Sequence, residues 1–291
     1  GLNPEVVKSI IRQAENLPTY SLRAAYSEDA LELVEELSRI APIRGDVRAI
    51  FVNSGSEAMD AALRSIIWHT DKKILLSFIG AYHGSTLATS SISFNSSWIG
   101  CEAGFMKTIH IPYPYCFRCP LGLDLSKCGT SCLTYLEDVI SRIGSQKIAS
   151  MVLEPIQVEA GVIVPPRNYI EKFLKMIGEK KILLTLDEVS TAPGRSGRWF
   201  AAEHWNLDAD VICLGPQLSS GLPLGIVLAR ESILDLEPET FESTTGGCQL
   251  SIVSALTTLR IIRDEGLVER AERLGRNILK KLNDLKDEVE L

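Results

Sequence analysis

Long apolar runs are absent from the sequence. The longest ones, in KILLTLDEV and DVICLG, stop after a handful of residues, whereas a transmembrane helix needs about 20. The pattern of a secretory signal is also absent from the first residues, because GLNPEVVKSIIRQAENL has the apolar spacing of an amphipathic helix. These absences argue against a membrane protein and against a secreted one, so we expect a soluble, cytoplasmic protein.

An excess of basic residues is absent as well. The chain has 30 Lys and Arg against 37 Asp and Glu, a formal net charge of −7, and no basic cluster. Proteins that bind nucleic acids usually carry a basic patch, so we expect no nucleic-acid partner. What the 291 residues do contain is 45% hydrophobic residues, enough for a substantial buried core.

No repeat, low-complexity stretch or Gly/Ser/Pro linker divides the chain. Segments with helical apolar spacing alternate with short apolar segments typical of buried strands, which predicts βαβ crossovers and a mainly parallel sheet. VICLG and PLGIVLA follow each other closely enough for one of them to run antiparallel. The expected fold class is therefore α/β, with one sheet domain and flanking helices. The expected strands lie in AIFVN, ILLSF, TIHI, ASMVLE, ILLTLD, VICLG and PLGIVLA.

Four of the seven cysteines are concentrated in one segment, YCFRCPLGLDLSKCGTSC. Their spacing is C-x2-C followed by C-x3-C, which is close to that of a structural zinc site but looser in its second half. Free thiols, or disulfides that pin a loop, are the alternatives for the same pattern. The other three cysteines are expected to be ordinary core or loop residues. The candidate zinc ligands are Cys116, Cys119, Cys128 and Cys132, and the scattered residues are Cys101, Cys213 and Cys248.

Polar residues follow several of the expected strands, at the position where ligands bind in parallel α/β sheets. After AIFVN, a turn of small residues that includes Gly55 and Ser56 opens a helix. The free N–H groups and the dipole at a helix N-terminus suit a phosphate. An ordinary serine N-cap is the alternative explanation of the same residues.

Three other strand exits carry side chains that could do chemistry. Tyr82 and His83 follow ILLSF, Glu154 follows ASMVL, and Asp187 follows ILLTL. A buried carboxylate at a strand end is costly unless it meets a cation or several hydrogen-bond donors. A protonated pyridine nitrogen would be such a partner for Asp187.

The order of these features along the chain resembles the motif series of the class III, fold-type-I aminotransferases, which depend on pyridoxal 5′-phosphate (PLP). The resemblance runs over nearly the whole chain and implies the large-domain fold of that family. It divides the chain into an N-terminal helical segment (1–45), a PLP-binding large domain (46–262) and a helix that leads to a small domain (263–291). The motifs that carry the resemblance are NSGSEAMDAAL, AYHGST, LEPIQVEAGVIVPP, LDEVSTAPGRSGRWFAAEHW, LDADVICLG and SSGLPLG.

The resemblance implies roles for the residues of a cofactor site. Gly55 and Ser56 would bind the phosphate, and Asp187 would keep the ring nitrogen protonated so that the ring can act as an electron sink. Tyr82 and Val189 would contact opposite faces of the ring, and core packing is the alternative for these two. The predicted cofactor-binding residues are Gly55, Ser56, Tyr82, His83, Glu154, Asp187, Val189 and Thr244.

The resemblance also implies partners. The substrates would be an amino acid and a 2-oxo acid, with Glu154 and Glu159 on the substrate side of the site. The family resemblance further implies a homodimer, in which Thr244 would reach the PLP phosphate of the neighbouring subunit.

The residue that departs most from the family pattern is Pro216. In the family a lysine follows the strand that corresponds to VICLG, forms a Schiff base with PLP and moves a proton during the reaction. Here this place reads Gly215-Pro216-Gln217, and no lysine occurs between Lys181 and Lys280. Proline has no amine, no acid or base and no N–H, so the sequence predicts no catalytic residue at this place.

Other departures from the family pattern accompany this one. Ser190 stands where the family usually has a glutamine, and Ala192-Pro193 and Cys248-Gln249 replace the usual pairs. The resemblance also leads us to expect that the chain is short at both ends, without the first strand segment and without the small domain. That domain would supply an arginine for the substrate carboxylate.

Three functions are open from the sequence. The first is an aminotransferase-like protein that is impaired or inactive because Pro216 replaces the lysine. The second is a pseudoenzyme that acts as a subunit or scaffold and binds PLP without a covalent bond, or binds none. The third is a PLP-dependent amino acid racemase or isomerase, because PYPYCFRCPLG resembles a loop of archaeal members with such activities.

Overall fold

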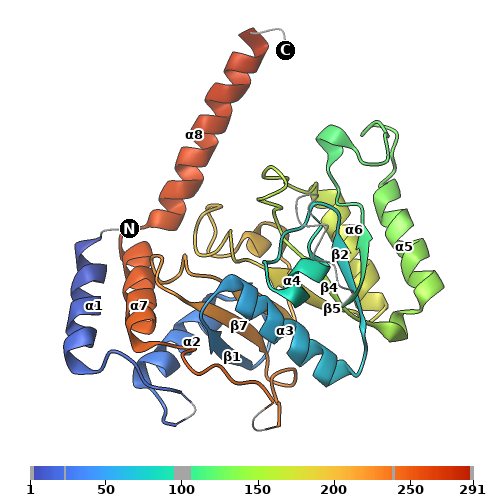
Figure 1. The fold of residues 1–291 in the computed structure, drawn as a ribbon. Coiled ribbons are helices and arrows are strands. Elements are labelled where there is room, and N and C mark those ends of the chain that lie inside the picture. Colours follow the sequence, from blue (N-terminus) through green and yellow to red (C-terminus); the bar gives the residue numbers. More distant parts are fainter. Residues whose placement is uncertain (1–2, 23, 95–105, 238–239, 289–291) are drawn as a thin grey trace.

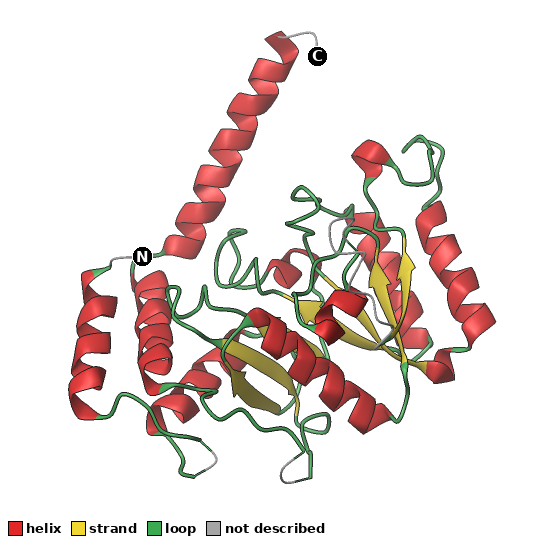
Figure 2. Ribbon diagram, in the orientation of Figure 1, coloured by secondary structure: helices red, strands yellow, loops and turns green. Residues whose placement is uncertain are grey.

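A computed structural model describes residues 3–22, 24–94, 106–237 and 240–288. Within these ranges the strands form one sheet, and helices pack on both of its faces (Figures 1 and 2). The strand order is β1-β7-β6-β5-β4-β2-β3. The strands are β1 (Val47–Val52), β2 (Ile74–Phe78), β3 (Lys107–Ile111), β4 (Ile148–Leu153), β5 (Leu183–Asp187), β6 (Val211–Leu214) and β7 (Gly225–Arg230).

The strand directions confirm the predicted α/β class with a mainly parallel sheet. β7 pairs antiparallel with both β1 and β6, and the other pairs are parallel. The close succession of VICLG and PLGIVLA is explained by this arrangement, because β6 and β7 are antiparallel neighbours that need no crossover helix.

Some of the helices separate strands along the chain, and the others precede β1 or follow β7. α1 and α7 lie side by side at one end of the molecule, and α8 extends away from the body (Figure 1). The helices are α1 (Pro4–Asn16), α2 (Glu28–Ile40), α3 (Gly55–Thr70), α4 (Leu87–Ile92), α5 (Ser131–Ile143), α6 (Arg167–Glu179), α7 (Gln249–Asp264) and α8 (Leu267–Glu288), with short 3-10 turns at Cys116–Arg118, Ser145–Lys147 and Ala201–Trp205.

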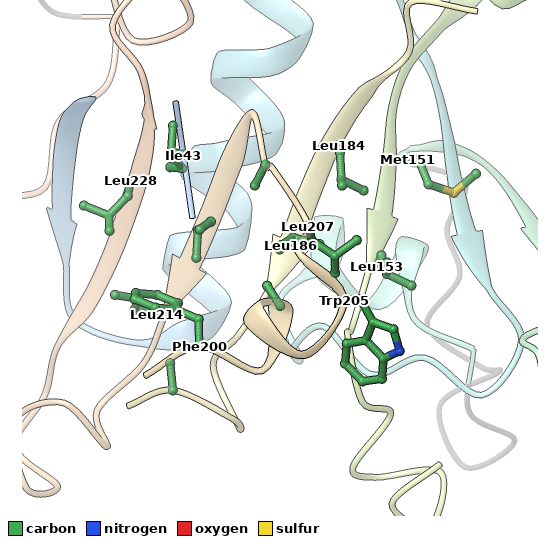
Figure 3. Packing of buried hydrophobic residues seen from close by; sticks show 14 of the residues in the cluster. Ile43, Met151, Leu153, Leu184, Leu186, Phe200, Trp205, Leu207, Leu214 and Leu228 are labelled. Atoms are coloured by element: carbon green, nitrogen blue, oxygen red, sulfur yellow. The ribbon is translucent and has the colours of Figure 1, made fainter. Parts of the chain in front are cut away.

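The core has two layers because successive side chains of a strand point to opposite faces of the sheet. Ile212 and Leu214 of β6 belong to the layer that α2, α5, α6 and α7 cover, whereas Val211 and Cys213 face α3 and α4. All residues of β2, β4 and β6 are buried, as continuous apolar strands predict. Figure 3 shows residues of several strands in the first layer, with the indole of Trp205 near Leu153.

α8 differs from the other long helices because, beyond its first turn with the buried Val268, large apolar side chains are exposed. Leu274, Ile278 and Leu282 are 48–59% exposed. Among the described residues, no helix combines the length and the apolarity that crossing a lipid bilayer requires.

Candidate functional site

The predicted site residues lie at one edge of the sheet. β1, β2, β4, β5 and β6 run in the same direction, so their carboxyl ends point the same way. Asp187 is the last residue of β5, Glu154 follows β4, and Gly215 follows β6. The edge therefore collects side chains from segments far apart in the sequence, as the strand-exit argument predicted.

Asp187 and His83 form the closest polar contact of this edge. His83 Nδ1 lies 2.8 Å from Asp187 Oδ2, and Val189 N–H donates to Asp187 Oδ1 over 3.0 Å. Both side chains are buried, and His83 N–H also donates to Ser93 Oγ. The carboxylate is thus held in one orientation by groups on both of its oxygens. The two residues are 104 positions apart in the sequence, so their spacing does not indicate that they form a pair.

Glu154 is a second buried carboxylate beside Asp187. Its Oε2 accepts a hydrogen bond from Tyr82 N–H over 3.2 Å, which ties the end of β4 to the segment after β2. Burial raises the pKa of Glu154 well above its ordinary value, and the negative charge of Asp187 acts in the same direction. Two close buried carboxyl groups favour a ligand that brings positive charge or a proton.

The turn before α3 has the features of an anion-binding helix start. Ser54 Oγ accepts from Glu57 N–H and caps the helix, while Ser56 Oγ accepts from Ser85 N–H over 3.2 Å. A Cβ on Gly55 would lie 2.6 Å from Val189 Cγ1, so this position needs glycine. The turn therefore packs directly on Val189, which lies two residues after Asp187.

Thr244 lies outside the buried part of the site. It is exposed, in the segment that precedes α7, and the neighbouring Thr245 Oγ1 donates to Asn53 Oδ1 over 3.2 Å. The structure thus places the Thr244 segment beside the turn before α3. It does not bury Thr244 with Asp187 and Glu154.

The segment after β6 forms a tight turn. Pro216 C=O accepts from Ser219 N–H and Gly221 N–H over 3.1 and 2.9 Å. A Cβ on Gly215 would lie 2.7 Å from Val189 Cγ1 and 2.9 Å from Gln217 Oε1. Gly215 therefore packs against the same valine as the turn before α3, and the Gln217 side chain lies close to Gly215.

Glu188 is a residue of this edge whose role the sequence did not reveal. Its side chain is fully buried and accepts from Ala201 N–H and Ala202 N–H over 3.0 and 2.7 Å, and from the Thr191 hydroxyl. Burial raises its pKa to about 7. Glu188 therefore fixes the loop that follows β5. The only signal in the sequence was a second acidic residue directly after a buried strand.

Replacing Glu188 with Gln should remove part of the pH dependence of folding stability. The pKa of this carboxyl is higher in the folded chain, about 7, than its ordinary 4.5, so the folded chain holds the proton more tightly. Its stabilising contribution is complete below pH 4.5 and is lost as the pH rises through about 7, by about 3 kcal/mol. Urea unfolding at a series of pH values measures this change.

The control is Glu171→Gln on the exposed face of α6, which should keep the pH profile of the unmodified chain. If Glu188→Gln also kept that profile, Glu188 would not carry the effect.

The four clustered cysteines line a small pocket at the 3-10 turn Cys116–Arg118 and the start of α5, and each is a free thiol. Among the described residues, no group of three or more His, Cys, Asp or Glu could hold a metal ion, so the zinc prediction is not supported. Burial raises the pKa of Cys116, and that of Cys132 to about 11, so both thiols are protonated at neutral pH while no metal is bound. Of the scattered cysteines, Cys213 is a core residue as expected, Cys248 is half-buried, and Cys101 lies outside the described residues.

Comparison with known proteins gives relatives over nearly the whole chain. The leucine/methionine racemase of Thermococcus litoralis is 35% identical, over 99% of this chain and 66% of its own. A probable 4-aminobutyrate aminotransferase of Bacillus subtilis is 32% identical, over 98% of this chain and 66% of its own. This chain therefore spans about two thirds of the length of these relatives.

The fold comparison agrees with the sequence comparison. A transaminase solved with L-alanine superposes with a TM-score of 0.91 at 28% identity, over 98% of this chain and 71% of that one. The family model of class III aminotransferases matches residues 2–291. This chain belongs to the class III aminotransferase family.

Proposed function

We propose that this chain binds PLP without a covalent bond at the strand edge around Asp187. We further propose that it transfers amino groups between an amino acid and a 2-oxo acid only at a strongly reduced rate. The observation that carries the proposal is Pro216, two residues after the end of β6, where the resemblance to the family leads us to expect the lysine.

The residues of the strand edge fit PLP. Gly55 and Ser56 offer N–H groups at the start of α3, where the helix has no internal acceptor for them. A Cβ on Gly84 would lie 2.4 Å from Ser56 Oγ, so the chain keeps two glycines close to the serine that would face the phosphate. Asp187, buried and fixed by His83 and Val189, supplies the negative charge that a pyridinium needs.

PLP supplies an electron sink for the bond changes at the α carbon of an amino acid. The protein side of this chemistry is present in part. Asp187 would hold the proton at the ring nitrogen, and His83 would keep the carboxylate turned towards it. Val189 would pack against one face of the ring. Tyr82, anchored through its N–H to Glu154, would pack against the other.

What the chain lacks is a group that moves the α proton. Pro216 has neither an amine for covalent attachment nor a base, and a positioned general base typically contributes about 10²–10⁴ in rate. Because covalent attachment of PLP and proton transfer are both lost at Pro216, we propose that amino-group transfer is slow.

The partners are also proposals. Thr244 is exposed on a segment beside the turn before α3, which suits a residue that reaches the phosphate of a second subunit. We therefore propose a homodimer in which Thr244 of each subunit reaches the cofactor site of the other.

An amino acid racemase is the second candidate function. The observation that favours it is the 35% identity to the Thermococcus litoralis racemase. Racemisation also requires removal of the α proton, so Pro216 would impair this activity in the same way. Loss of optical rotation in a single amino acid, measured without any 2-oxo acid, separates racemisation from transamination.

Titration of the purified chain with PLP tests the proposed function. We expect saturable quenching of tryptophan fluorescence and retention of PLP during ultrafiltration, with complete release on denaturation. An excess of pyridoxine should compete weakly, because it lacks the phosphate that the turn at Gly55 and Ser56 would bind. Absence of saturable binding would contradict the proposal.

A further inference from the structure

Gln217 holds an orphaned hydrogen-bond acceptor inside the proposed cofactor site. Its side-chain oxygen, Oε1, is buried and has no hydrogen-bond partner among the described residues. A buried acceptor without a partner costs about 1–3 kcal/mol, so such a group calls for a donor from outside the chain.

This oxygen lies close to Gly215, which packs on the valine proposed to contact the ring. A Cβ on Gly215 would lie 2.9 Å from Gln217 Oε1 and 2.7 Å from Val189 Cγ1. The same Val189 methyl would lie 2.6 Å from a Cβ on Gly55, at the turn proposed for the phosphate. Gln217 Oε1 thus lies next to the valine proposed to contact the ring, one residue after the proposed place of the lysine.

The buried acidic side chains at the same edge of the sheet are a second observation. Glu154, Asp187 and Glu188 are each at most 7% exposed. Among the described residues, the only ion-pair partner of these three carboxylates is His83, on Asp187. Carboxyl groups buried together either hold a proton, as the raised pKa of Glu154 indicates, or require a cation, so a ligand that brings positive charge suits this edge.

We propose that Gln217 makes this site selective for the amine form of the cofactor, pyridoxamine 5′-phosphate, over its aldehyde form, PLP. The inference rests on the proposed function, because it assumes that this edge binds the cofactor. A protonated amine carries N–H donors and a positive charge, whereas an aldehyde offers only an acceptor. Where a lysine is present, a covalent bond favours the aldehyde, and Pro216 removes that advantage.

Equilibrium dialysis with each cofactor form separately tests the proposal on the unmodified chain, Gln217→Leu and Gln217→Glu. We expect the unmodified chain to bind the amine form at least about tenfold more tightly, as a hydrogen bond to a charged donor allows. Gln217→Leu should lose that preference by weakening binding of the amine form alone. Gln217→Glu should increase the preference, because a carboxylate attracts the ammonium more strongly than an amide.

The outcomes separate the inference from the proposed function. If neither form binds to the unmodified chain, the proposed function fails. If both forms bind equally, or if Gln217→Leu weakens both by the same factor, cofactor binding stands and the role of Gln217 is overturned. Gln146→Leu, on the surface before β4, is the matched control and should keep the preference of the unmodified chain. Urea midpoints of all variants show whether a lost preference comes from lost folding.

Discussion

Replacing Pro216 with Lys should convert the chain into one that binds PLP covalently. A lysine at this place would put an amine at the end of β6, beside the turn that packs on Val189. The change should be tolerated by the backbone, because Pro216 holds its turn through its carbonyl, which lysine retains. We expect a new visible absorption band and, after borohydride reduction, a phosphopyridoxyl group on the introduced lysine.

The same variant should gain activity by a large factor. A general base contributes about 10²–10⁴ in rate, so the half-reaction with a reactive amino acid should rise by at least about 10² over the unmodified chain. Stopped-flow absorbance with PLP-loaded protein measures this gain. Pro223→Lys is the matched control, because it introduces the same amine at an exposed position of the same loop and should give neither the adduct nor the rate. If Pro216→Lys formed the adduct without any half-reaction, the loss of chemistry would not be due to Pro216 alone.

Replacing Asp187 with Asn should weaken cofactor binding about 10- to 100-fold, because a hydrogen bond to a charged group is worth about 1.5–3 kcal/mol. Asparagine keeps an oxygen for Val189 N–H but loses the charge that would face the ring nitrogen and His83. Equilibrium dialysis of PLP and of pyridoxamine 5′-phosphate measures the loss, which should be similar for both forms because they share the ring.

Asp210→Asn is the matched control for Asp187. Asp210 is also a carboxylate at the sheet, where it accepts from Leu184 N–H and pairs with Arg230. Its replacement should lower the urea midpoint and leave cofactor affinity unchanged. If Asp187→Asn bound both forms as tightly as the unmodified chain, Asp187 would not be the partner of the ring nitrogen.

The architecture could be predicted from the sequence because it depends on local patterns. Apolar strands such as ILLSF and ASMVL alternate with amphipathic helices, and this periodicity alone predicts a mainly parallel sheet. Since ligands bind at the carboxyl ends of such strands, the positions of Glu154 and Asp187 directly after two of them suffice to place both residues at one edge.

The contacts within the site could not be predicted in this way. The Asp187–His83 pair depends on which strands are neighbours and on the turn after β2, and neither follows from spacing. For Glu188 the sequence offers only its place after a buried strand, because its bonds to Ala201 and Ala202 depend on the path of the loop after β5. The cysteine spacing suggested zinc because spacing does not report whether the four thiols converge on one point, and among the described residues no such metal-binding group is found.

The most direct test of the central claim uses the unmodified chain. The protein is incubated with PLP and dialysed, and one half is reduced with borohydride before the segment 186–225 is analysed by mass spectrometry. If PLP binds without a covalent bond, the native protein retains PLP and the reduced segment carries no phosphopyridoxyl group. A covalent adduct within this segment, or native protein that retains no PLP, would contradict this claim.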